Sequence, residues 1–588
     1  MIVRYNDLAS SAQTFEEIIE KKSVYVDKTS YLAKLLSNNI KVWFLARPRC
    51  FGKTLTVSTL EAVFSAEKRE LFRGLDIYSR LNEARFAPRP VIRLDMSELT
   101  VDGGLEELKR SLGEMIVKIA AKQDLTLDPS LPPKSLLVQL IERTAENSKR
   151  KVAILIDDYD APFLAFMDRS SEERENLFES MCFFYKAFKS LDRYISFIFV
   201  TGIANKLHFE FSAVLNTIYD ISSEPLFGAM CGFTQAELED KFAHDLKRTA
   251  ATLKMTEKEL VAKMADYYYG FSFDGRTRLY NPFSTLLFFQ KQEFKNYWYD
   301  TGNHAYLADS LKKNRLTVEG FRGLVVDEDF AEIPVELSND DPSCYLYQAG
   351  YLTLRPGLKD DEFTLDYSNR EVLESLSDLW VRNILDAKLA SKLYLDLKNG
   401  LDNGDAPLVI ANLNTLLAKI PDDALDAARK EDQLEKTAWE DVRRAERKRE
   451  TNQREDKKRW GNFLESLYRQ AFFALFRGAG LDVSGEAHRN LDRPDLMARR
   501  EKWAWMLEII VNQDEEDKEI ETLKNARTRM IEKRYAAGHQ SAICLGIVIN
   551  DQKKTIANWA NFGDLAKEYM AIQNRSPEES PKSESTKD

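Results

Sequence analysis

Residues suited to binding phosphate lie between positions 42 and 55, where an apolar run leads through a short loop into Gly52-Lys53-Thr54. Such an order, with Gly-Lys-Thr opening a helical pattern, is typical of a phosphate-binding loop (P-loop). There, backbone N–H groups and the helix N-terminus bind phosphate oxygens, the lysine reaches the β- and γ-phosphates, and the threonine hydroxyl joins the Mg²⁺ shell. The sequence therefore predicts an ATP and Mg²⁺ site. The expected nucleotide-contacting residues are Arg47, Pro48, Arg49, Cys50, Phe51, Gly52, Lys53, Thr54 and Leu55.

One position departs from the usual P-loop pattern. The motif ordinarily begins with glycine five residues before Gly52, and this chain has Arg47 there. The first turn of the loop must therefore form without the residue that most easily takes unusual backbone angles. An ordinary α/β domain with a coincidental Gly-Lys-Thr is the competing interpretation.

A second apolar run ends in two acids, Asp157 and Asp158. At the carboxyl edge of a parallel sheet, Asp157 is expected to hold Mg²⁺ through water, together with Thr54 as a metal ligand. Asp158 stands where many ATPases place a glutamate as general base, and its shorter side chain predicts slow hydrolysis. Thr201, at the end of a third run, is a candidate sensor of the γ-phosphate, with a strand cap as the simpler alternative.

A sheet is needed to bring these residues to one edge. Short runs rich in β-branched or aromatic residues alternate with segments long enough for crossover helices. This order predicts a doubly wound α/β domain with a parallel sheet. The expected strands are Val42–Leu45, Val91–Leu94, Val152–Ile156 and Tyr194–Val200.

The rest of the chain predicts further folded parts. From Thr234 to Leu354 the pattern is helical and aromatic, which indicates a smaller second domain. Residues 370–425 are also expected to be helical. A charged stretch follows over 427–459, interpreted as a solvated helix, with contact of its basic end to phosphate as the alternative. The apolar helix predicted at Phe463–Phe476 and the strands expected at 503–511 and 542–549 suggest a third unit.

Composition restricts the classes of protein. At 588 residues, with 44% apolar and 30% charged residues, the chain predicts two to four folded domains. No apolar run approaches the roughly 18 residues that span a bilayer, and the start lacks the pattern of a signal peptide, so we expect a cytoplasmic protein without membrane contact. The five cysteines form no CxxC pair, and no histidines are paired at metal-ligand spacing. A net charge of −11 gives no overall attraction to nucleic acid.

Several segments closely resemble the bacterial AAA-ATPase-like family. They are Tyr25-Val26-Asp27-Lys28-Thr29, the loop Leu45 to Thr54 with its Arg47-Pro48-Arg49, Leu155 to Pro162, Thr201-Gly202, Cys231-Gly232-Phe233-Thr234, Tyr280-Asn281-Pro282-Phe283, Tyr297-Trp298 with Thr301-Gly302, and Gln348-Ala349-Gly350-Tyr351-Leu352. Family members lack the first P-loop glycine, so the resemblance accounts for Arg47. They usually have Asp-Glu-Tyr-Asp where this chain has Asp157-Asp158-Tyr159-Asp160, so Asp158 is a departure.

The same resemblance implies a C-terminal nuclease-like domain of the PD-(D/E)XK superfamily. The matching carboxylates are Asp495 and Glu508, assisted by Glu465, which would hold Mg²⁺ in an active member. Ile510 stands where the family has its catalytic lysine, and an apolar side chain neither activates water nor stabilises developing charge. Arg529 occupies a position where relatives commonly have glutamine, and Lys502 and Lys524 are candidates for a migrated lysine. We therefore expect a lost or weakened nuclease.

These expectations divide the chain into five parts. They are a P-loop AAA-like ATPase domain over 1–233, a helical lid or winged-helix-like domain over 234–365, a helical and highly charged connector over 366–460, a degenerate PD-(D/E)XK nuclease-like α/β domain over 461–570, and a disordered tail over 571–588. The preferred function is an ATP-dependent switch whose C-terminal part binds DNA, RNA or a protein. The alternatives are an ATP-regulated nuclease acting in defence and a non-enzymatic scaffold. Oligomeric state stays open.

Overall fold

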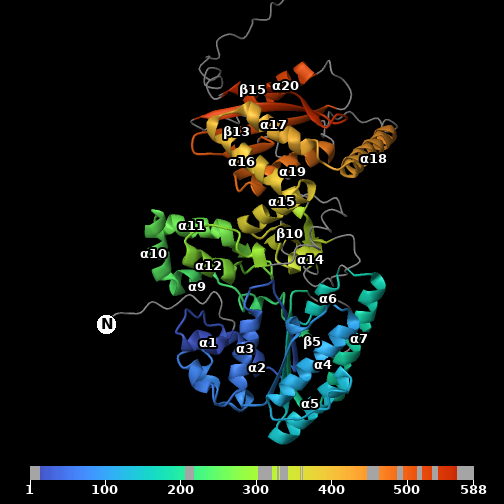
Figure 1. The fold of residues 1–588 in the computed structure, drawn as a ribbon. Helices are drawn as coiled ribbons and strands as arrows, with labels where there is room; N and C mark the ends of the chain where they lie inside the picture. The colour runs from blue at the N-terminus through green and yellow to red at the C-terminus, as the bar shows by residue number, and fades with distance from the viewer. Residues whose placement is uncertain are drawn as a thin grey trace, which may run out of the picture. The chain divides into compact units, whose positions relative to one another are not determined.

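The computed structural model describes residues 14–167, 169–204, 218–301, 321–327, 330, 342–357, 359, 362–446, 463–485, 494–512, 519–532, 541–563 and 565. The chain forms two compact units (Figure 1). Unit 1 comprises residues 1–306 and 321–372, and unit 2 comprises 307–320 and 373–588. Within the described residues, no helix combines the length and apolar character needed to cross a bilayer.

The core of unit 1 is a five-stranded parallel sheet in the order β2-β3-β4-β1-β5. Its strands are β1 (Val42–Ala46), β2 (Val91–Asp95), β3 (Val152–Asp157), β4 (Ile195–Gly202) and β5 (Ile218–Asp220). The four predicted runs are confirmed as strands. The fifth was not predicted, because three residues with one apolar aliphatic side chain carry too little pattern.

Helices cover both faces of this sheet (Figure 1). They are α1 (Phe15–Glu20), α2 (Thr29–Ser37), α3 (Lys53–Phe64), α4 (Leu105–Ala121), α5 (Pro133–Ser148), α6 (Ala161–Ala165) and α7 (Ser171–Ser190), with 3₁₀ turns η1 (Arg69–Phe72), η2 (Tyr78–Arg80), η3 (Ala84–Phe86) and η4 (Met96–Glu98). One apolar cluster joins alternate β1 residues, Val42, Phe44 and Ala46, to α4, α5 and α7. Successive strand residues point to opposite faces, and α3, which contacts β2, β3 and β4, contributes nothing to that cluster. The doubly wound α/β fold is therefore confirmed for the N-terminal region.

A mainly helical part completes unit 1. Its helices are α9 (Gln235–Lys241), α10 (Ala243–Leu253), α11 (Glu257–Tyr268), α12 (Pro282–Lys291) and α14 (Ser343–Gln348), with η5 (Pro225–Phe227) and η6 (Tyr299–Thr301). Its strands are the pair β6 (Tyr269–Phe271) and β7 (Leu279–Tyr280), and the sheet β8-β10-β9 of β8 (Val325–Asp327), β9 (Leu352–Pro356) and β10 (Glu362–Tyr367). An aromatic-rich core that includes Tyr268, Tyr280 and Phe288 holds the helices together. The predicted helical character is thus observed, with two small sheets added.

Unit 2 packs helices on a second five-stranded sheet, in the order β11-β12-β13-β14-β15. Its strands are β11 (Asp482–Gly485), β12 (Leu496–Arg499), β13 (Ala504–Asn512), β14 (Ala542–Asn550) and β15 (Thr555–Gly563), and its helices are α15 (Arg370–Ile384), α16 (Ala387–Asn403), α17 (Ala406–Leu417), α18 (Asp422–Glu446), α19 (Phe463–Gly478) and α20 (Glu519–Glu532). Strands β13 and β14 are parallel, with α20 between them in the chain, and the other pairs are antiparallel. Helix α15 begins in unit 1 and continues into unit 2.

The segment expected as a connector, 366–460, contributes to the packing of unit 2. Helix α16 contacts α19, and α17 contacts both α19 and β15. The helix expected in the charged stretch is present as α18 up to Glu446. The basic end of the charged stretch lies outside the described residues, with Arg447, Lys448, Arg449, Lys457, Lys458 and Arg459, and so does the tail over 571–588 that was expected to be disordered.

Candidate functional site

The P-loop connects β1, which ends at Ala46, to α3, which begins at Lys53. Gly52 has φ +100°, a backbone angle that L side chains rarely adopt, and Cys50 has φ +59°. A Cβ added at Gly52 would meet no atom within 4 Å. The space on the Cβ side of Gly52 is therefore open, and the left-handed backbone at this position rather than crowding accounts for the glycine.

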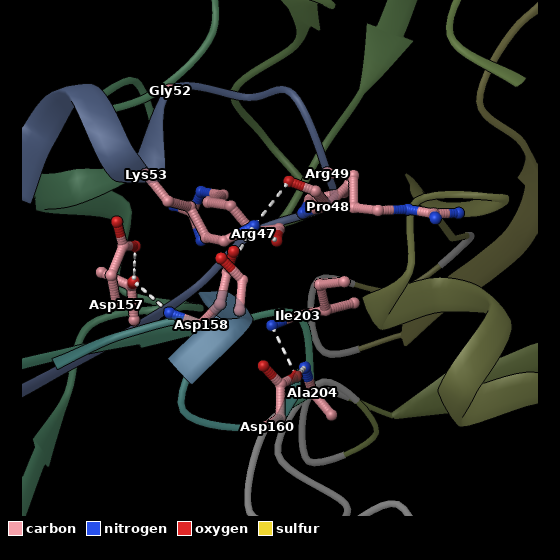
Figure 2. A network of polar contacts seen from close by, with 12 residues as sticks. Arg47, Pro48, Arg49, Gly52, Lys53, Asp157, Asp158, Asp160, Ile203 and Ala204 are labelled. Carbon is pink, nitrogen blue, oxygen red and sulfur yellow. Dashed lines mark hydrogen bonds and ion pairs between the residues drawn. The ribbon is translucent and has the colours of Figure 1, made fainter. Parts of the chain in front are cut away.

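Lys53 is buried at the base of this loop, with 5% of its surface exposed. Its ammonium donates to the carbonyl oxygens of Arg47 (3.1 Å) and Pro48 (3.2 Å), and lies 3.5 Å from Asp158 Oδ1 (Figure 2). The two carbonyl oxygens are neutral, and the partly exposed Asp158 supplies a negative charge at 3.5 Å. A bound phosphate would bring further negative charge to this ammonium and would replace its contacts with the carbonyls.

Asp157 ends β3 on the same edge of the sheet as the loop. Its Oδ1 accepts from the Thr201 hydroxyl at 2.7 Å, and its Oδ2 accepts from Arg93 at 3.2 Å. Burial, and then the neighbouring charge of Asp158, raises the pKa of Asp157 above its ordinary value. A carboxylate oxygen accepts more than one hydrogen bond, so Asp157 retains capacity for a metal-bound water.

The predicted sensor Thr201 links the tips of β3 and β4. Besides donating to Asp157, its hydroxyl accepts from the Asp158 N–H at 3.3 Å. Strand β4 lies between β1 and β3, which places Thr201 between the loop and the acids. Thr201 therefore fixes the two acids, and its role as a sensor of the γ-phosphate stays a prediction.

Asp158 faces Lys53 from a left-handed backbone conformation, with φ +46°. Its side chain is 30% exposed, and its Oδ1 has no hydrogen-bond partner among the described residues. Such a conformation is uncommon outside glycine and is often found at functional sites. Asp158 is thus the acid of this pair that faces the loop with a carboxylate oxygen able to accept a further hydrogen bond.

Asp160 was not predicted as a site residue from its chemistry. Its Oδ2 accepts the N–H groups of Ile203 and Ala204, both at 2.8 Å (Figure 2). Complete burial, and next the charge of Asp158, raises its pKa to about 6. The close fit requires Gly202, since a Cβ there would lie 2.6 Å from the Tyr159 ring and 2.8 Å from Asp160 Oδ1. Asp160 therefore fixes the turn that follows Thr201.

Arg47 reaches the site through its backbone. Its guanidinium donates to the carbonyls of Ala46 (2.8 Å), Ser222 (2.7 Å) and Phe227 (3.3 Å) and lies over the Phe273 ring, 4.4 Å from its centroid. It is 1% exposed, and burial lowers its pKa. The side chain thus ties β1 to the segment after β5, while the Arg47 carbonyl contacts Lys53. This anchoring role explains an arginine where glycine is usual.

The three carboxylates predicted in the C-terminal part are brought near one another, but each contacts an arginine. Arg469 donates to both Asp495 (3.0 Å) and Glu465 (2.8 Å), and Arg529 donates to Glu508 (2.7 Å), which is 2% exposed. Asp495 Oδ2 also accepts the Ile509 N–H at 2.6 Å.

A Mg²⁺ ion does not fit this set of residues. Arginine is permanently charged, so Arg469 and Arg529 place fixed cations against the oxygens that a metal would need. Among the described residues, no group of three or more His, Cys, Asp or Glu is arranged to hold a metal. The lysine candidates do not change this: Lys502 lies over the Trp503 ring and Lys524 is exposed.

Comparison with known proteins supports the N-terminal assignment. The chain is 28% identical over 423 residues to a protein of Azotobacter chroococcum mcd 1 described as "Uncharacterized protein in vnfD 5'region", a match that spans 70% of this chain and 77% of the relative. Residues 10–209 match a family model described as "Predicted AAA-ATPase". The family match ends before unit 2, so the nuclease-like resemblance stays a prediction. The α/β region of unit 1 is thus similar, over residues 10–209, to the predicted AAA-ATPase family.

Proposed function

We propose that this protein binds ATP with Mg²⁺ at the P-loop and acts as a slowly hydrolysing, nucleotide-dependent switch. The observation that carries the proposal is the buried ammonium of Lys53 at the N-terminus of α3, which contacts the Arg47 and Pro48 carbonyls and lies 3.5 Å from Asp158, just after β3. The AAA-ATPase-like match over residues 10–209 supports ATP as the ligand.

Each loop residue has a separate task in this proposal. The backbone N–H groups of the loop and of the first turn of α3 bind phosphate oxygens, and the Lys53 ammonium contacts the β- and γ-phosphates. Bound Mg²⁺ would neutralise charge on the β- and γ-phosphates. Thr54 and Asp157 are the residues suited to hold it, Thr54 through its hydroxyl and Asp157 through water.

Asp158 is the residue proposed to orient the attacking water and accept its proton. Its shorter reach than glutamate and its position 3.5 Å from the Lys53 ammonium both limit this role. A slow turnover is characteristic of a switch, in which contacts made by the γ-phosphate favour one conformation until hydrolysis removes them.

For unit 2 we propose binding of a partner, either nucleic acid or protein, without cleavage. Ile510 in place of lysine and the arginine contacts of Glu508 and Asp495 support this over an ATP-regulated nuclease. The intact Lys53, Thr54 and Asp157 argue against a purely passive scaffold.

A binding titration tests the proposal. Calorimetry with ATP and Mg²⁺ should give saturable binding by the wild-type protein and none by Lys53→Ala. The matched control is Lys41→Ala, which removes a lysine that precedes β1 and pairs with Asp192, and it should bind as the wild type does. Equal affinity in Lys53→Ala and wild type would reject the site.

A further inference from the structure

Four segments that lie beyond residues 10–209, the part of the chain that matches the AAA-ATPase-like family and is called the AAA-like domain below, converge on the P-loop. They contribute Gly232, Phe271, Trp298 and Gly350, which all belong to unit 1. Three of these residues come from the motifs Cys231 to Thr234, Tyr297-Trp298 and Gln348 to Leu352, for which the loop chemistry gave no role. Their contacts with the loop suggest that the helical part of unit 1 helps to shape the phosphate site.

Trp298 makes the most direct polar contact. Its indole N–H donates to the Arg49 carbonyl at 2.9 Å, and its side chain is almost fully buried. Its backbone N–H donates to Glu371 Oε1 at 2.7 Å. Glu371 is itself completely buried and accepts from the Ser284 hydroxyl. Trp298 is therefore held in a rigid frame while it contacts the loop.

A second contact fixes the other side of the loop. The Gly232 N–H donates to the Phe51 carbonyl at 3.2 Å. Phe51 is buried, with its ring edge-on to Phe271 (4.8 Å between centroids) and Phe273 (5.4 Å). Gly350 packs on the preceding turn, where an added Cβ would lie 2.6 Å from Pro48. The loop is thus held by a hydrogen bond from Gly232, by aromatic rings around Phe51, and by the packing of Gly350 on Pro48.

These contacts determine where two backbone amides point. In a planar trans peptide the C=O and the following N–H lie in opposite directions, and the described peptide bonds of this loop are trans. Because Trp298 holds the Arg49 carbonyl, the Cys50 N–H points away from Trp298. Likewise, the Gly52 N–H points away from Gly232.

We propose that Trp298 and Gly232 are positioning residues for the nucleotide: they orient the Cys50 and Gly52 amides toward the phosphates of ATP. This inference rests on the proposed ATP binding and adds to it that affinity depends on residues outside the AAA-like domain. It also predicts that nucleotide binding affects the helical part of unit 1. A shift of the loop backbone when its amides bind phosphate would change the hydrogen bond between the Arg49 carbonyl and Trp298.

The test removes single indole hydrogen bonds. Trp298→Phe deletes the bond to Arg49 and keeps an aromatic ring, and should weaken ATP binding about 5-fold to 10-fold by calorimetry. Two matched controls lose the same type of bond elsewhere: Trp43→Phe, from the Ile40 carbonyl (3.1 Å), and Trp505→Phe, from the Leu401 carbonyl (3.0 Å). Both should bind ATP as the wild type does, even where their melting temperatures fall as far as that of Trp298→Phe.

A milder variant covers the case in which Trp298→Phe does not fold. Ser284→Ala removes one donor to Glu371, loosens the frame of Trp298, and should weaken ATP binding about 2-fold to 3-fold. The inference is overturned if wild type binds ATP and Lys53→Ala does not, while Trp298→Phe and Ser284→Ala keep wild-type affinity. It is also overturned if Trp43→Phe weakens binding as much as Trp298→Phe. Absence of binding by the wild type would reject the proposed function itself.

Discussion

The two sheets of this protein carry carboxylates at sites that the sequence marks for metal chemistry, and they differ in the cations that face them. In unit 1, Asp157 accepts one hydrogen bond from Arg93 at 3.2 Å, and Asp158 lies 3.5 Å from Lys53, whose hydrogen bonds go to carbonyls. In unit 2, Glu508 and Asp495 contact Arg529 and Arg469 at 2.7 and 3.0 Å.

Carboxylates next to cations thus occur in both units, but the two arrangements differ in whether they can bind a further ligand. A lysine whose hydrogen bonds go to carbonyls, with one partly exposed carboxylate at 3.5 Å, can still take an incoming anion, whereas a buried carboxylate bound by arginine is already neutralised and hydrogen-bonded. The first arrangement leaves a site open to ligand, and the second closes it. Stability and ligand response should therefore differ between the two regions.

The largest expected effect is on stability, and it comes from removing the arginine that contacts Glu508 in unit 2. Arg529→Ala leaves Glu508 buried without its cation and should lower the free energy of unfolding of unit 2 by about 3 to 5 kcal/mol. Chemical denaturation followed by circular dichroism measures the loss. The double variant Glu508→Leu with Arg529→Met should recover much of it, because replacing both partners removes the buried carboxylate together with its cation. A loss below about 1 kcal/mol in the single variant would remove the contrast.

The second effect is stabilisation of the open site by its ligand. Mg²⁺ with ATP at about 100 times the dissociation constant should stabilise the cooperative unit that contains the P-loop by about 2.7 kcal/mol. Scanning fluorimetry would detect this as a rise in melting temperature for wild type and none for Lys53→Ala. Mg²⁺ alone should leave the melting of unit 2 unchanged. A rise caused by Mg²⁺ alone and lost in Asp495→Ala would show that the C-terminal carboxylates do hold a metal.

A smaller effect concerns pH and Asp160. Its pKa is raised from 3.8 to about 6 by burial, so the folded state binds the proton more tightly than the unfolded state, and ionisation lowers stability. On acidification from pH 7 to pH 5, wild type should gain about 1 kcal/mol relative to Asp160→Asn, which keeps an oxygen for the N–H groups of Ile203 and Ala204 but does not titrate. Denaturation at both pH values measures the difference, and parallel stabilities would contradict it.

The smallest expected effect is on nucleic-acid cleavage. Incubation of purified protein with single- and double-stranded DNA and with RNA, in Mg²⁺ or Mn²⁺, should give no cleavage above that of Asp495→Ala. Cleavage that disappears in Asp495→Ala would overturn the binding role proposed for unit 2.

The sequence predicted the parts of the structure that local patterns encode. The apolar strands, the loop that ends in Lys53 and the strand that ends in Asp157 are where periodicity and motif placed them. Contacts between segments that are distant in the chain could not be predicted from the sequence. That Arg47 bonds to the Ser222 carbonyl, that Asp160 caps the turn after Gly202, and that Trp298 reaches Arg49 depend on tertiary packing, which no local spacing reports.

The arginine contacts in unit 2 show the same limit. Ile510 and Arg529 were visible as departures from the family pattern, but Arg469 follows Glu465 by one helical turn and reads as an ordinary intrahelical ion pair. Only the fold shows that it also contacts Asp495.

The most direct test of the central claim is a structure of the protein with Mg²⁺ and a non-hydrolysable ATP analogue. We expect the triphosphate over the N-terminus of α3, with Lys53 Nζ bonded to phosphate oxygens and the Cys50 and Gly52 amides directed at them. A nucleotide bound elsewhere, with Lys53 still on the Arg47 and Pro48 carbonyls, would contradict it.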